Sequence, residues 1–171
     1  MSIIVEDGTI VANANSFCDR VFADNYHLSK LYSETWNAST GANKDLALMT
    51  ATSQLDTLVH WNGFKTDVNS SLSWPRTFVT TRDGQTIGSN EIPIFLKRAT
   101  AELAGAFLVE NRLAESEMNG INKLTVGPII IEANQQASRG FSKPTFPRAV
   151  IGLISGFGIV AGNGSIALVR S

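Results

Sequence analysis

Cysteine and histidine are scarce in this chain. Among its 171 residues there is one cysteine, Cys18, so no intrachain disulfide can form. A single thiol is typical of a reducing compartment or of a fold that needs no covalent cross-links. The two histidines, His27 and His60, have no cysteine, second histidine or carboxylate pair at ligand spacing. We therefore expect no metal site.

Charge is also sparse, and neither sign is in large excess. Charged residues make up 17% of the chain, with 14 Lys and Arg against 15 Asp and Glu, a formal net charge of -1. Proteins that bind nucleic acid through its phosphates usually carry a clustered basic excess, whereas here the basic residues are scattered among acidic ones. The composition therefore argues against strong DNA binding through bulk charge. A hydrophobic fraction of 43% is enough for the core of one domain.

Long apolar runs are absent as well. The longest apolar region, 149–161, is interrupted by Gly152, Ser155, Gly156 and Gly158, which makes it too short and too broken to span a bilayer. The first residues lack the basic and apolar regions of a secretory signal. We expect a soluble protein that is made inside the cell and has no membrane partner.

No catalytic motif is recognisable. Ser155 misses the Gly-x-Ser-x-Gly spacing of a nucleophile elbow by one residue. The glycines of the region 156–164 complete neither a dinucleotide-binding fingerprint nor a P-loop. Cys18, near the start of a predicted helix, is more simply explained as a core residue than as a nucleophile. We therefore expect no enzyme activity and no cofactor.

The spacing of apolar residues predicts a mainly α fold. We expect a small bundle of about four helices with a short β-hairpin element and an extended C-terminal tail. The expected helices cover about 16–31, 40–62, 93–113 and 147–155, with a loop over 33–43. In the first of them, Phe17, Val21, Leu28 and Leu31 are expected to face inward, behind Ser16 as N-cap.

Strand and turn signals are fewer. Asp83-Gly84 stands between β-prone residues and predicts a hairpin turn. Around 124–126 and 129–131, where apolar and β-branched residues flank Gly127-Pro128, we expect two short strands or one bent strand. We expect one helical domain over 1–155 and a flexible, Gly-rich tail over 156–171.

Four aromatic residues lie close together in the sequence, interleaved with basic ones: Trp61, Phe64, Trp74 and Phe78, with Lys65, Arg76 and Arg82. Aromatic stacking combined with basic residues is how single-stranded nucleic acid is bound without sequence preference. The alternative is a structural anchor, in which Trp74 and Pro75 pin an irregular loop to the helices and Arg76 pairs with a carboxylate. The absence of a wider basic stripe favours the anchor.

Short motifs along nearly the whole chain resemble, in order and spacing, a family of small proteins encoded beside the capsid and portal genes of tailed bacteriophages. Members are often labelled DnaT-like single-stranded-DNA-binding proteins, and they are similar to head-to-tail connector (adaptor) proteins. The sequence departs from the family in its longer C-terminal tail and around 138–141. The motifs that carry the resemblance are Ile4-Val5-Glu6-Asp7-Gly8-Thr9, Ala12-Asn13-Ala14-Asn15-Ser16, Ala23-Asp24-x-Tyr26, Ala47-Leu48-x-x-Ala51-Thr52-x-x-Leu55-Asp56, Leu72-Ser73-Trp74-Pro75-Arg76, Asp83-Gly84, Ile92-Pro93, Ala99-x-x-Glu102-Leu103-Ala104, Val126-Gly127-Pro128-Ile129 and Phe146-Pro147.

The resemblance implies a structural virion protein of the neck, between capsid and tail, that is made in the host cytoplasm. Its subunits would form a dodecameric ring below the portal protein and bind tail, stopper or nozzle proteins. Double-stranded DNA would pass through the lumen without specific binding. The tail is the expected docking segment for the portal or tail proteins, through Phe157, Ile159, Ile166, Leu168, Val169 and Arg170. The family label leaves a single-stranded-DNA-binding replication accessory protein as the alternative.

Overall fold

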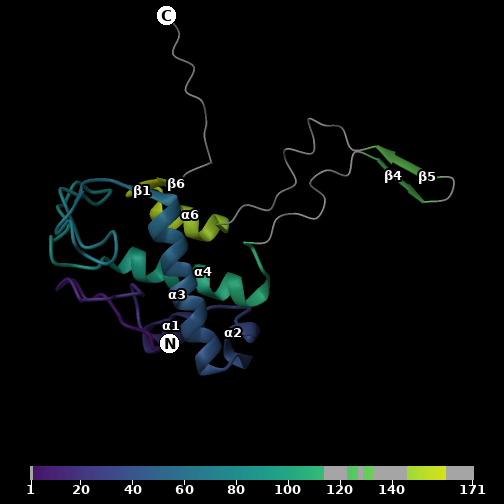
Figure 1. The fold of residues 1–171 in the computed structure, drawn as a ribbon, viewed down its shortest axis with the longest axis horizontal. Coiled ribbons are helices and arrows are strands. Elements are labelled where there is room, and N and C mark those ends of the chain that lie inside the picture. Colours follow the sequence, from purple (N-terminus) through teal and green to yellow (C-terminus); the bar gives the residue numbers. More distant parts are fainter. Residues whose placement is uncertain (1, 114–122, 127–128, 133–145, 161–171) are drawn as a thin grey trace, which may run out of the picture. The chain divides into compact units, whose positions relative to one another are not determined.

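The computed structural model describes residues 2–113, 123–126, 129–132 and 146–160 of the chain (Figure 1). The chain divides into two compact units, one formed by Met1–Glu110 with Phe146–Ser171 and the other by Asn111–Thr145. A single helical domain over 1–155 was expected, and a second unit interrupts it. The described residues form five helices: α1 (Arg20–Leu28), α2 (Glu34–Ala38), α3 (Gly41–Leu58), α4 (Ile94–Val109) and α6 (Arg148–Ile154).

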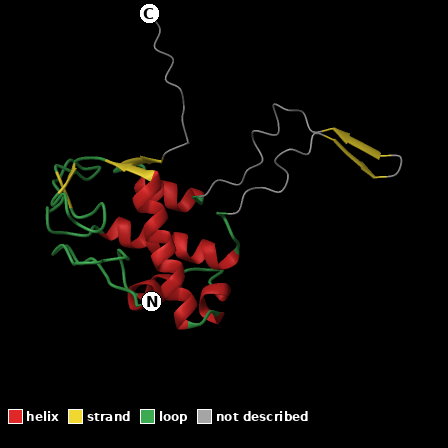
Figure 2. Cartoon of the chain, viewed as in Figure 1, coloured by secondary structure: helices red, strands yellow, loops and turns green. Residues whose placement is uncertain are grey.

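The fold is mainly α, with short antiparallel strand pairs, as the apolar spacing predicts (Figure 2). Three two-stranded sheets occur in the described part of the chain. The first of the alternatives expected around 124–131, two short strands, is confirmed as the third of these pairs. The pairs are β1 (Val59–Trp61) with β6 (Gly158–Val160), β2 (Phe64–Lys65) with β3 (Arg76–Thr77), and β4 (Lys123–Val126) with β5 (Ile129–Glu132).

Helices α3 and α4 form the centre of the first unit, and α4 also packs against α1, α2 and α6. Both helices bury stripes with helical spacing, and several members of these stripes are small, which lets the two backbones approach closely. The helix expected over about 40–62 is confirmed for Gly41–Leu58, with the Thr40 hydroxyl accepting a hydrogen bond from the backbone N–H of Asn43. Its expected last turn forms strand β1 instead. The buried residues are Ala47, Leu48, Ala51, Thr52 and Leu55 on α3, and Leu96, Ala99, Thr100, Ala101, Leu103 and Ala104 on α4.

The first helix differs from the prediction. It begins at Arg20 because the Asp19 side chain, not that of Ser16, accepts from a first-turn N–H group. Phe17 is buried as expected, whereas Val21 and Leu28 are exposed. Helix α1 buries Ala23 and His27 instead, and the short helix α2 occupies part of the expected loop over 33–43.

The boundary of the C-terminal tail was placed too early. A flexible segment from Gly156 was expected, but β6 pairs in antiparallel register with β1, with Val59 opposite Val160 and Trp61 opposite Gly158. The adjacent Phe157 is buried. The reason is that the glycine at 158 permits close packing, since a Cβ atom there would lie 2.7 Å from Val59 Cγ1. Residues 161–171 lie outside the described part.

The N-terminal segment is organised around a buried acid, Glu6. Its carboxylate accepts hydrogen bonds from the backbone N–H groups of Gly8 (2.9 Å), Ile10 (3.0 Å) and Val11 (2.8 Å). Ile10 has a φ of 64°, a conformation that is unfavourable for a β-branched residue. The three charge-assisted hydrogen bonds to the Glu6 carboxylate stabilise this turn and offset the unfavourable backbone conformation of Ile10.

His27 links α1 to α2 and α4 within the first unit. The histidine is buried, and its Nε2 lies 2.9 Å from the carbonyl oxygen of Ala101, so this nitrogen carries the proton. Its ring stacks on Trp36 at 4.3 Å between centroids. The position opposite is Gly105, where a Cβ atom would lie 2.6 Å from His27 Cε1. A larger residue at 105 would displace the ring.

We expect protonation of His27 to destabilise the fold. Burial lowers the pKa of His27 from its usual value of 6.5; the Ala101 carbonyl opposes the shift, Lys30 adds to it, and Glu102 and Asp24 oppose it. The folded state therefore prefers the neutral ring. Its contribution to stability is complete above the unfolded pKa and is lost as the pH falls through the lower, folded pKa. The thermal unfolding midpoint should thus decrease from about pH 7 to about pH 5.

The comparison that isolates this effect is His27→Phe, which keeps an aromatic ring and removes the titrating group. This variant should lose part of the decrease of the midpoint below about pH 6.5. His60→Phe, at an exposed histidine, is the control and should retain it. Superimposable pH profiles for the wild type and His27→Phe would contradict the assignment.

Candidate functional site: the aromatic hairpin

The aromatic residues of the region 61–78 separate into a buried pair and an exposed pair. Trp61 and Trp74 are buried and meet edge to face at 5.8 Å between ring centroids. Trp74 has an exposed fraction of 0% and also meets the ring of Phe95 at 5.8 Å. Neither indole is accessible to a base, so the tryptophans belong to the core.

The exposed pair lies on the β2–β3 hairpin. Phe64 and Phe78 are 70% and 80% exposed, and their rings meet edge to face at 6.3 Å. In the register of the hairpin Phe64 is opposite Thr77. Phe78 follows with a φ of 58°, in the left-handed region. A side chain at Gly63 is excluded, because its Cβ would lie 2.1 Å from the Thr77 carbonyl oxygen.

Arg76 fastens this hairpin to the rest of the unit. Its guanidinium donates hydrogen bonds to four backbone carbonyl oxygens, and partial burial lowers its pKa while Asp56 acts in the opposite direction. The carboxylate partner expected from the sequence is replaced by carbonyl groups. The adjacent Pro75 is buried, and the Trp74–Pro75 peptide is cis. The four acceptors are the carbonyl oxygens of Asn62 (2.8 Å), Ser73 (3.0 Å), Trp61 (3.3 Å) and Gly63 (2.7 Å).

The other basic side chains of the region also donate to protein acceptors. Lys65 Nζ lies 2.9 Å from the carbonyl oxygen of Ser70. The Arg82 guanidinium donates to the carbonyl oxygen of Gly152 at 2.9 Å and to the hydroxyl of Ser155 at 3.3 Å. A single-stranded-DNA site needs cations that track the phosphate backbone. Here the basic groups nearest in sequence to the two phenylalanines already have partners.

A second group of exposed apolar side chains lies at the end of α1. Leu28 is 71% exposed, and Leu31 and Tyr32, in the turn that follows, are 80% and 91% exposed. The turn is held by an ion pair between Lys30 and Glu102 of α4. The prediction that Leu28 and Leu31 face inward is therefore wrong. Apolar residues occur at helical spacing on more than one face of α1, so their spacing does not show which face is buried. Packing against α4 buries the face that carries Ala23.

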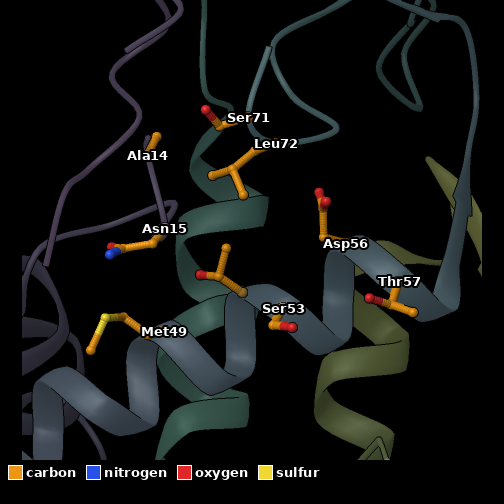
Figure 3. Close-up of a pocket in the computed structure, with 9 residues that line it drawn as sticks. Ala14, Asn15, Met49, Ser53, Asp56, Thr57, Ser71 and Leu72 are labelled. Carbon is orange, nitrogen blue, oxygen red and sulfur yellow. The ribbon is translucent and has the colours of Figure 1, made fainter. Parts of the chain in front are cut away.

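A pocket of about 290 Å³ opens beside α3 (Figure 3). Its one titratable lining residue is Asp56, whose Oδ1 accepts a hydrogen bond from the backbone N–H of Ser73 at 2.6 Å. A single carboxylate among hydroxyl groups does not form an acid–base pair. The lining residues are Ala14, Asn15, Met49, Thr52, Ser53, Asp56, Thr57, Ser71 and Leu72.

The remaining candidate for reactive chemistry, the thiol of Cys18, is not accessible. Cys18 is buried, and desolvation raises the pKa of its thiol to about 12, so it is not a reactive thiolate. Among the described residues, no three His, Cys, Asp or Glu side chains gather where they could hold a metal ion. In the same part of the chain no helix is long and apolar enough to cross a membrane.

The residues predicted for docking are not brought together in the described structure. Phe157 lies in the core, where its ring stacks on Phe95 at 3.7 Å between centroids. Ile159, on β6, is 72% exposed. Ile166, Leu168, Val169 and Arg170 lie outside the described residues. Phe157 is therefore unavailable as a docking residue, and docking through the remaining positions stays a prediction.

These features define a mainly α-helical protein with an exposed aromatic hairpin and a separate apolar patch. The family described as "Putative DnaT-like ssDNA binding protein" matches residues 1–171, and the chain belongs to this family. Comparison with the curated proteins and with the solved structures found no match.

Proposed function

We propose that this protein is a structural subunit of a bacteriophage virion, a head-to-tail connector that joins neighbours through its surface. The observation that carries the proposal is the presence of two separate groups of exposed apolar side chains on one helical unit. One group is Phe64 and Phe78, and the other is Leu28, Leu31 and Tyr32. Exposed apolar groups of this kind mark protein–protein contacts. The resemblance of the ordered sequence motifs to phage connector proteins supports this particular assembly.

A conduit for DNA has no need to hold its cargo tightly, which agrees with the near-neutral charge of the chain. The proposal includes assembly of the subunits into a dodecameric ring that contacts the portal and tail proteins. We expect mass spectrometry of purified virions to detect the protein at a stoichiometry near that of the portal protein. Its absence from virions would refute the connector function.

A second candidate is a single-stranded-DNA-binding protein, as the family description states. The observation that favours it is the exposed Phe64–Phe78 pair, since bases stack on accessible aromatic rings. Native mass spectrometry with a thirty-base oligonucleotide tests it at low salt. If this function holds, a Phe64→Ala/Phe78→Ala variant should lose binding, and Leu28→Ala should not. Equal masses with and without the oligonucleotide would remove this candidate.

A further inference from the structure

We propose that Asn62 is a modification site, at which the folded chain spontaneously converts this asparagine to aspartate and isoaspartate. The residue lies in the turn between β1 and β2 and is followed by Gly63. Asparagine before glycine is the pair most prone to deamidation, because glycine has no Cβ atom to hinder attack by its backbone nitrogen. The inference goes beyond the proposed function and does not depend on it, since the reaction needs only water.

The reaction balances within the chain and with water. The backbone nitrogen of Gly63 attacks the side-chain Cγ of Asn62 and gives up its proton, which closes a five-membered succinimide ring. The Cγ–Nδ2 bond breaks, and ammonia leaves with that proton. Water then opens the ring. Hydrolysis at Cγ gives aspartate, whereas hydrolysis of the former peptide bond gives isoaspartate, in which the backbone runs through the side chain.

Both reacting groups of this pair are accessible. Asn62 is exposed, and within the described residues its side chain makes one hydrogen bond, from Nδ2 to the carbonyl oxygen of Gly156 at 3.5 Å, longer than the usual range. In the same part of the chain the backbone N–H of Gly63 has no hydrogen-bond partner. The attacking nitrogen and the leaving amide therefore lose no strong hydrogen bond when they react.

A second exposed asparagine, Asn69, shows the difference. It is followed by Ser70, whose backbone N–H donates to the carbonyl oxygen of Asp67 at 3.2 Å. The nitrogen that would attack is therefore engaged, and the serine side chain hinders it further. Exposure alone does not make an asparagine reactive, and the free N–H of the following glycine distinguishes Asn62.

Arg76 restrains the peptide group that must rotate before the attack. Its guanidinium donates to the carbonyl oxygen of Asn62 at 2.8 Å and to that of Gly63 at 2.7 Å. The backbone N–H of Asn62 donates to the carbonyl oxygen of Phe157 at 2.8 Å. Attack on Cγ requires rotation about the bond between Cα and the carbonyl carbon of Asn62, which breaks the first of these bonds. We therefore expect the reaction to proceed through local opening of the turn.

The modification changes the hairpin that carries Phe64. Isoaspartate adds one carbon atom to the backbone before Gly63, which fits so closely that a Cβ atom there would lie 2.1 Å from the carbonyl oxygen of Thr77. A longer backbone has no room in this position, so the hairpin must shift. The aspartate product keeps the backbone length, but its carboxylate cannot donate to the carbonyl oxygen of Gly156. Either product adds one negative charge to the turn.

Peptide mapping by mass spectrometry tests the site on the full-length folded chain, incubated at mildly alkaline pH well below its melting midpoint. We expect Asn62 to be converted to both products while Asn69 stays unchanged. The same chain unfolded in urea should react at Asn62 at least about tenfold faster, since one hydrogen bond to a charged group shifts an equilibrium by about that factor. Asn62→Gln should give no conversion at this position, because a six-membered ring forms much less readily.

Arg76→Lys isolates the restraint, because a lysine cannot bind several carbonyl oxygens in one plane. This variant should convert Asn62 about tenfold faster than the wild type. Arg20→Lys, which alters a guanidinium bound to Asp45, is the matched control and should react like the wild type. Circular dichroism shows whether Arg76→Lys is folded during the incubation. If it is not, urea below the unfolding transition tests the same point on the wild type and should accelerate the conversion.

Each result decides a specific point. A folded chain that keeps Asn62 intact after the unfolded chain has reacted would overturn the site. Equal conversion of Asn62 and Asn69 in the folded chain would also overturn it, because exposure alone would then explain the reaction. A rate that changes with neither Arg76→Lys nor urea would overturn the restraint by Arg76.

Discussion

Replacing Trp74 with alanine is expected to lower the free energy of unfolding by about 3 kcal/mol. The side chain is fully buried and meets the rings of Trp61 and Phe95, so its removal leaves a cavity that these rings cannot fill without moving. The measurement is urea-induced unfolding followed by circular dichroism. An unchanged midpoint would contradict the placement of Trp74 in the core.

Two further variants separate packing from other effects. Trp74→Phe keeps an aromatic ring and removes an indole N–H that has no hydrogen-bond partner in the described part of the chain, so its loss should be smaller. Phe64→Ala, on the exposed side of the same hairpin, should change stability by less than about 0.5 kcal/mol. A loss of oligonucleotide binding in Trp74→Ala would therefore report unfolding rather than a lost stacking contact.

Replacing Glu6 with alanine is expected to cost a similar amount, about 3 kcal/mol, because three backbone N–H groups lose their acceptor at once. The affected groups belong to Gly8, Ile10 and Val11, and the carboxylate that binds them is fully buried. Chemical unfolding measures the loss. The turn that holds Ile10 at positive φ should open first, which amide hydrogen exchange of 8–11 would detect.

The matched control is the neighbouring acid. Asp7→Ala removes a carboxylate that accepts from the backbone N–H and the hydroxyl of Thr9 at an exposed position, so its effect should be much smaller than that of Glu6→Ala. Glu6→Gln should lie between the two, because an amide keeps one accepting oxygen and places an NH₂ group against the remaining donors. Equal losses for Glu6→Ala and Asp7→Ala would refute the special role of the buried carboxylate.

The sequence predicted an element correctly where the residues that stabilise the element lie within it or directly next to it. The periodic apolar stripe of α3, with Thr40 as its cap, is readable without tertiary information. The Asp83-Gly84 turn is similar: Gly84 has a φ of 80° and donates to the carbonyl oxygen of Thr81. The strands around Gly127-Pro128 follow the same logic.

The sequence did not predict which of several similar apolar side chains are buried and which are exposed. Phe64 and Trp74 are both aromatic and lie in one irregular segment, yet one is exposed and the other is in the core. The difference arises because Trp74 contacts the rings of Trp61 and Phe95, which lie in other parts of the sequence. For the same reason Arg76 could be recognised as part of an anchor, but its carbonyl partners could not.

By itself the sequence determined the mainly α character, the positions of most helices and of the strand pair β4–β5, and the lack of any recognisable catalytic or metal-binding motif. These follow from composition and from periodicity, which act over a few residues. Tertiary structure alone decided that β6 joins β1, that Phe157 enters the core, and that Phe64, Phe78 and Leu28 remain at the surface. The physical reason is that burial depends on which distant surface a side chain meets, and pairing across about 100 residues leaves no local pattern.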